Sequence, residues 1–134
     1  MNLKGFKSNI EKDTLENNTF RKVLYTGKNM QLVLMNLNAG EEIGEEIHHG
    51  NDQFFRFESG AGKCIINKTE YKVKEGDAIV VPAGAKHNII NTDSTAALQM
   101  YTIYAPPHHL DGIRRDTKAD AASNEEQFDG KTTE

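Results

Sequence analysis

Residues 76–91 read Gly76-Asp77-Ala78-Ile79-Val80-Val81-Pro82-Ala83-Gly84-Ala85-Lys86-His87-Asn88-Ile89-Ile90-Asn91. The stretch is an apolar run, a turn, and a histidine that opens a second apolar run. Pro82 fixes φ and Gly84 tolerates conformations that other residues avoid, so together they predict a sharp turn between two strands. Because residues 78–81 are apolar throughout, we expect both faces of the first strand to be covered. The turn would then aim His87 inward from a rigid corner.

A second stretch, at residues 40–60, carries polar side chains at alternate positions and reads GEEIGEEIHHGNDQFFRFESG. Glu46 and His48 flank Ile47, and positions i and i+2 of a strand share a face. Gln53 opens the next strand after a short loop. The two stretches therefore predict that four side chains converge on one metal ion: Glu46, His48, Gln53 and His87. His49 has the opposite parity and is expected to be exposed.

The chain between residues 20 and 104 consists of short apolar or alternating runs separated by turn residues about every ten positions, which is typical of all-β proteins. The clearest runs are 31–37, 53–58, 64–66, 70–73, 78–81 and 96–104. Many short antiparallel strands favour a closed barrel or a two-sheet jelly roll, because either shelters exposed strand edges. The interior of such a barrel holds one small ligand.

The ends of the chain differ from this central part. We expect an N-terminal extension at 1–19, a β-barrel domain at 20–105 and a polar C-terminal tail at 106–134. The stretch 117–128 is compatible with a helix but carries little apolar surface, so the tail is expected to pack weakly or fray.

Composition excludes several classes of protein. At 134 residues the chain is expected to form one domain, and it lacks the apolar run of roughly 18 residues that a transmembrane helix needs. A net charge of −4 with no basic face argues against a nucleic-acid partner. The N-terminus lacks the apolar region of a signal peptide, and the single Cys64 forms no internal disulfide. A cytoplasmic location is therefore expected.

Both stretches resemble the two motifs of the cupin superfamily. The second family motif, G-x5-P-x-G-x2-H-x3-N, is matched at every defined position, by Gly76, Pro82, Gly84, His87 and Asn91. The first, G-x5-H-x-H-x3-4-E-x6-G, is matched in spacing from Gly40 to Gly60, with position 46 as first histidine, 48 as second and 53 as glutamate. The resemblance implies a double-stranded β-helix, or jelly-roll barrel, and a homodimer.

Two metal-ligand positions depart from the family pattern, since Glu46 replaces a histidine and Gln53 replaces a glutamate. The ligand set keeps one negative charge but offers two oxygens and two nitrogens, which favours manganese, iron, nickel or zinc over copper. If Gln53 contacts only a bound water, the other three form a two-histidine, one-carboxylate face with open positions. The sequence leaves these alternatives open.

In length and in the stretch Asp52-Gln53-Phe54 the chain is most similar to short cupins described as mannose-6-phosphate-isomerase-like. The resemblance implies a metal-dependent enzyme on a small polar, sugar-like substrate, such as an isomerase, with Arg56, Lys63 and Lys86 as candidates to bind a phosphate. One alternative is a non-haem metal dioxygenase on a small organic substrate. Another is a module that binds or senses a small ligand without catalysis.

Strand parity also suggests residues of the cavity wall. Phe55 and Phe57 share the face of Gln53. On the last strand one alternating set faces inward, either Gln99, Tyr101 and Ile103 or Met100, Thr102 and Tyr104, and Tyr101 is a candidate catalytic hydroxyl. His108 and His109 follow two prolines and could cap the cavity.

Overall fold

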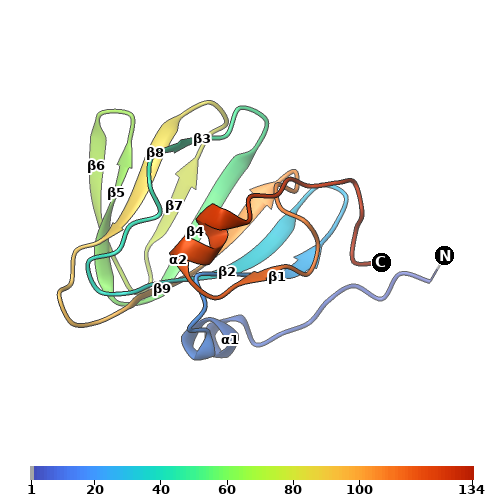
Figure 1. Ribbon diagram of the computed structural model, residues 1–134, viewed down its shortest axis with the longest axis horizontal. Helices are drawn as coiled ribbons and strands as arrows, with labels where there is room; N and C mark the ends of the chain where they lie inside the picture. Colours follow the sequence, from blue (N-terminus) through green and yellow to red (C-terminus); the bar gives the residue numbers. More distant parts are fainter. Residues whose placement is uncertain (1) are drawn as a thin grey trace.

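The computed structural model describes residues 2–134 as two antiparallel β-sheets that face each other (Figure 1). The six-stranded sheet has the order β10-β1-β2-β9-β4-β7, and the four-stranded sheet has the order β3-β8-β5-β6. The elements are α1 (Ile10–Glu16), β1 (Arg21–Thr26), β2 (Gln31–Leu37), β3 (Glu46–Ile47), β4 (Asp52–Ser59), β5 (Ala61–Ile66), β6 (Thr69–Lys74), β7 (Ala78–Val81), β8 (Lys86–Asn91), β9 (Leu98–Ala105), β10 (Arg114–Arg115) and α2 (Lys118–Ser123). The predicted jelly-roll architecture is confirmed.

The core lies between the two sheets and is filled by alternate residues of their strands. Phe55 and Phe57 of β4 are fully buried there, with their rings stacked at a centroid distance of 6.3 Å. Facing them from the four-stranded sheet are Cys64 and Ile89, which are also fully buried. Burial raises the pKa of the Cys64 thiol to about 11, so this cysteine is an inert core residue.

The burial pattern of β9 decides which of its faces points inward. Leu98, Met100, Thr102 and Tyr104 are buried, whereas the residues between them are partly exposed. Tyr101 therefore lies on the outer face, where its ring is 6.3 Å from that of Phe54. The hypothesis that Tyr101 lines the cavity is wrong, and Tyr104 is the tyrosine that faces the interior.

Strand β7 is buried on one face only. Val80 is 64% exposed, while Ile79 and Val81 point into the core. The strand forms the edge of the six-stranded sheet beyond β4. The expectation that both faces of this apolar run are covered is therefore wrong, because a sheet of this sandwich has only one face toward the core.

The two ends of the chain pack on the six-stranded sheet rather than fray. Helix α1 lies on its outer face, where Gln99 donates a hydrogen bond of 2.9 Å to the Leu15 carbonyl (Figure 1). Strand β10 pairs with β1, and Thr133 donates a backbone bond of 2.9 Å to Thr26. The tail is partly helical as expected, and hydrogen bonds hold it at several points, although most of residues 122–134 are exposed.

The second motif ends in a side chain that joins the two sheets. Asn91, on β8, is 1% exposed, and its amide donates hydrogen bonds to the carbonyls of Leu37, Asn38 and Ala96. Its oxygen accepts a bond of 2.9 Å from the Asp93 backbone N–H. Nearby, Gly60 has φ +95°, and a Cβ there would collide with the Ala97 carbonyl oxygen. These contacts explain why both motifs end in residues of restricted type.

We predict that Asn91→Ala lowers the free energy of unfolding by about 2–3 kcal/mol, because it leaves buried carbonyls without a donor. Chemical denaturation measures this change. Asn18→Ala, at an exposed position, is the matched control and should stay within about 0.5 kcal/mol of the parent protein. Equal stability of the two variants would contradict the structural role of the Asn91 amide.

Candidate metal centre

Two short segments hold the four predicted ligands in place. Glu46 lies directly opposite His87 in the pairing of β3 with β8, so the two side chains share a face. The turn before β8 packs on the loop after β3, because the Gly84 N–H donates a hydrogen bond of 2.9 Å to the His48 carbonyl. At the end of that loop the Asp52 carboxylate accepts a bond of 2.9 Å from Ala83 N–H. Two backbone N–H groups of the turn therefore hold the two motifs together, one bound to a backbone carbonyl and the other to a side chain.

The structure brings the predicted ligands to one end of the space between the sheets. His48 Nε2 lies 3.1 Å from Glu46 Oε2, and the His48 and His87 rings are 5.2 Å apart. Gln53 lies on the six-stranded sheet, and its amide donates a hydrogen bond of 3.0 Å to Thr102 Oγ1. His48, Gln53 and His87 are buried, and Glu46 keeps a third of its side chain exposed. His49, of the other parity, faces solvent as predicted, and so does Ile47.

Two buried atoms of this group that could bind a metal ion make no aligned hydrogen bond among residues 2–134. They are His48 Nε2 and Gln53 Oε1. The contact between His48 and Glu46 is close enough for an ion pair but is not aligned as a hydrogen bond. His87 Nδ1 lies 3.1 Å from the Ala85 carbonyl, so this nitrogen carries the proton and Nε2 keeps its lone pair. Metal-binding histidines have this arrangement.

The donor set fits a divalent ion, although the side chains are not gathered around one point. Two ligands at right angles, each about 2.1 Å from an ion, are about 3 Å apart, close to the separation of Glu46 and His48. In the part of the chain that the structure describes, however, no three His, Cys, Asp or Glu side chains are close enough to hold a metal as placed. The predicted convergence on one ion therefore stays a prediction.

Burial dominates the electrostatics of the site. It lowers the pKa of His87, and it lowers the pKa of His108 to about 4, assisted by the neighbouring His48. Burial raises the pKa of Glu46, but the approach of His48 and the charge of Arg21 outweigh it, so the net shift is downward. The site thus offers the neutral imidazoles of His87 and His108 and an ionised carboxylate, and neutral imidazoles and carboxylates are the forms that bind metals.

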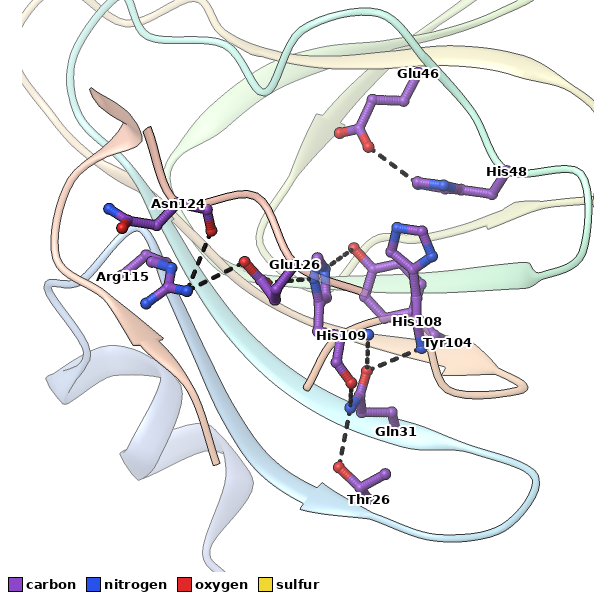
Figure 2. Close-up of polar contacts among 10 residues, drawn as sticks. All are labelled: Thr26, Gln31, Glu46, His48, Tyr104, His108, His109, Arg115, Asn124 and Glu126. Carbon is purple, nitrogen blue, oxygen red and sulfur yellow. Dashed lines mark hydrogen bonds and ion pairs between the residues drawn. The ribbon is translucent and has the colours of Figure 1, made fainter. Parts of the chain in front are cut away.

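The loop after β9 adds two histidines to this end of the barrel (Figure 2). Gln31 fixes its backbone, accepting bonds from the N–H groups of His108 and His109 and donating 2.8 Å to the His109 carbonyl. The His108 ring is 4.4 Å from that of His48 and 5.2 Å from that of Tyr104. The position of the His108 ring agrees with the expectation that these histidines cap the site.

His109 belongs to a buried polar chain behind the site. Its Nδ1 lies 3.0 Å from Glu126 Oε1, and its Nε2 lies 3.2 Å from the Tyr104 hydroxyl (Figure 2). Burial and the nearby Arg21 charge lower the pKa of His109 far below its usual range, so the ring is neutral. The network assigns the proton to Nδ1, and Tyr104 donates its hydroxyl proton to Nε2. Arg115 Nη2 completes the chain, 3.2 Å from the other Glu126 oxygen.

A cavity of about 670 Å³ leads from solvent to Glu46 and His108, within the size range of small-molecule sites. Its wall joins β1, the loop after β9 and the tail, and consists of Phe20, Arg21, Ile43, Glu46, His108, His109, Lys118, Ala121, Ala122, Glu125, Glu126 and Gln127. Phe55 and Phe57 are core residues outside this wall. No sequence motif marked Arg21 or Glu126.

The basic residues suggested for a phosphate lie elsewhere. Arg56 is paired with Glu58 on the outer face, at 2.9 Å. Lys63 is 3.4 Å from Glu70. Lys86 is 3.1 Å from Glu45, and none of the three basic residues lines the cavity.

Comparisons with known proteins agree with this architecture. The Cupin domain family matches residues 33–104, more than half of the chain. The uncharacterized protein YrkC of Bacillus subtilis (strain 168) is 48% identical over 129 residues, which cover 92% of this chain and 69% of YrkC. The uncharacterized protein L612 of Acanthamoeba polyphaga mimivirus is 40% identical over 92% of this chain and 81% of its own length.

Among solved structures, that of BH2720 from Bacillus halodurans superimposes with a TM-score of 0.88 at 40% identity, over 90% of this chain and 96% of BH2720. The chain therefore belongs to the cupin superfamily. None of the helices in residues 2–134 is long and apolar enough to cross a membrane.

The buried chain behind the site yields a stability prediction. Glu126→Ala removes the acceptor of both His109 and Arg115, so we expect the free energy of unfolding to fall by about 3 kcal/mol. Glu125→Ala, one residue away and exposed, is the matched control and should change stability little. Thermal and urea unfolding of both variants measure the difference, and a Glu126→Ala protein as stable as the control would show that the tail is not anchored there.

Proposed function

We propose that this cupin binds one divalent metal ion through Glu46, His48, Gln53 and His87, and that it is an enzyme acting on a small polar, sugar-like substrate. The observation that carries the proposal is a pair of buried ligand atoms that make no aligned hydrogen bond: Gln53 Oε1, and His48 Nε2, which lies 3.1 Å from Glu46 Oε2. An unsatisfied buried polar atom costs about 1–3 kcal/mol. A metal ion would offset this cost at Gln53 Oε1 and would bind His48 Nε2 and Glu46 Oε2 together. Membership of the cupin superfamily, in which metal sites are common, supports the same reading.

Isomerisation is the reaction that we propose. When bound, the metal would act as a Lewis acid that polarises a substrate oxygen. The protein contributes the remaining features. The cavity admits the substrate to Glu46 and His108. The Tyr104 hydroxyl is held in a fixed orientation by His109 and Glu126.

The metal assignment predicts opposite results for the substitution of two histidines, one a proposed ligand and one not. His87→Ala should lose the bound metal because it removes a buried nitrogen donor. His49→Ala, at an exposed position of opposite parity, should keep it. Elemental analysis of untagged protein, after exposure to manganese, iron, nickel or zinc and removal of free ion, measures metal per chain.

Circular dichroism of the same samples shows whether each variant is folded. Stoichiometric metal in folded His87→Ala protein would refute the ligand assignment. Substoichiometric metal in the parent protein with all four ions would instead favour a binding module without catalysis.

The reaction class is tested with the metal-loaded protein in deuterated water. An isomerase moves a proton next to a carbonyl, so we expect deuterium to enter the substrate carbon skeleton, as read by NMR, without consumption of oxygen. The panel consists of aldoses, ketoses and hydroxy acids, each incubated in air and under nitrogen. Oxygen uptake matched to substrate loss with the iron-loaded protein would contradict isomerisation and establish a dioxygenase.

A further inference from the structure

Arg21 holds a distinctive place in the cavity wall. It is the first residue of β1, and it lies on the same side of the strand as the buried Val23. Its guanidinium carbon is 5.3 Å from the centroid of the Phe20 ring, which also lines the cavity. Glu46 and His108 belong to the same wall. The side chain thus sits on the route by which a ligand reaches the candidate metal centre.

Arg21 differs from the other arginines of the chain in its charge partners. Arg56, Arg114 and Arg115 each have a carboxylate oxygen at 2.9–3.2 Å. Within residues 2–134, Arg21 has no carboxylate at ion-pair distance, which is what distinguishes it. Its buried Nε also has no hydrogen-bond partner, a feature that it shares with Arg56 and Arg115. A desolvated guanidinium N–H without an acceptor is costly. An anion in the cavity would remove that cost.

The strand register makes the unbalanced charge more unfavourable. Arg21 lies directly opposite Arg115 in the pairing of β1 with β10. Like charges directly opposite on antiparallel strands destabilise a sheet. Glu126 neutralises Arg115 at 3.2 Å. The charge of Arg21 lowers the pKa of Glu46, but no carboxylate of residues 2–134 lies at ion-pair distance from Arg21. The protein therefore keeps a second positive charge at this point of the sheet, and it faces the cavity.

We infer that Arg21 binds the carboxylate of a small organic acid, which is the substrate class of this cavity. A guanidinium matches a planar carboxylate with two parallel hydrogen bonds. A phosphate group is usually held by several cationic donors. This wall has only one other cation, Lys118, and it also carries the carboxylate of Glu125, so a phosphate fits it less well. The identification of this acid as the substrate rests on the proposed function. The anion site itself does not depend on the metal.

The test uses ligands that differ only in charge and shape. D-gluconate, D-glucose and D-glucose 6-phosphate share a six-carbon skeleton and carry a carboxylate, no charge and a phosphate, and acetate and lactate serve as smaller carboxylates. Binding is measured by calorimetry with metal-free protein, prepared with EDTA, and with metal-loaded protein. In parallel, NMR follows the Nε–Hε signal of Arg21, which hydrogen bonding to a carboxylate shifts.

We expect at least one carboxylate to bind the metal-free protein at least tenfold more tightly than glucose and to shift the Arg21 signal. Arg21→Met should abolish this preference, and Arg21→Lys, which keeps the charge but loses the planar fork, should restore it only in part. Lys22→Met, the exposed neighbour on the opposite side of β1, is the control and should bind as the parent protein does.

Each result has a distinct meaning for the two proposals. Carboxylate binding unchanged in folded Arg21→Met, or no carboxylate binding and no shift of the Arg21 signal in the parent protein, would overturn the inference. Tighter binding of glucose 6-phosphate and inorganic phosphate than of every carboxylate would replace it with a phosphate site. Should the parent protein bind no metal while the carboxylate preference depends on Arg21, the metal proposal fails and the anion site stands.

Discussion

The contact on which the rest of the fold depends is the Asn91 amide between the two sheets. Asn91 belongs to β8 of the four-stranded sheet, whereas Leu37 ends β2 of the six-stranded sheet and Ala96 precedes β9. One side chain therefore sets how far the sheets are apart at that end of the barrel. Because an amide donor cannot be replaced by an apolar group without leaving carbonyls unpaired, this position is restricted to few residue types. Strand β8 then carries the constraint to His87, four residues earlier.

At the opposite end, backbone N–H groups of the turn before β8 set the geometry of the site. The bonds from Gly84 to His48 and from Ala83 to Asp52 join the turn before β8 to the loop before β4. These contacts fix where His48 and Gln53 begin, whatever their side chains are. The ligand identities can therefore change, as at Glu46 and Gln53, without loss of the fold. Substitution there alters the donor set and leaves the framework as it is.

Sequence reasoning succeeded where local backbone chemistry determines structure and failed where long-range packing does. The sharp turn at Pro82 and Gly84 followed from dihedral limits, and the jelly roll followed from the spacing of short strands and the resemblance of the two motifs. The inward face of β9 could not be assigned, because both alternating sets contain a tyrosine and apolar residues. Val80 was misjudged because an apolar run does not reveal that its strand lies at a sheet edge.

The unforeseen part of the site comes from the tail, which a polar composition suggested would be loose. Burial of Glu126 is possible because Arg115 balances its charge and the neutral His109 donates a hydrogen bond to it. Polar contacts therefore anchor the tail in addition to the buried Ala121. Amino-acid composition gives the share of apolar residues, and it does not reveal anchoring by buried polar pairs. The anchored tail then supplies Lys118 and Glu126 to the cavity wall opposite the barrel residues. Arg21 gains its place beside a cavity only because the tail closes over the first strand, which no local pattern around Arg21 could show.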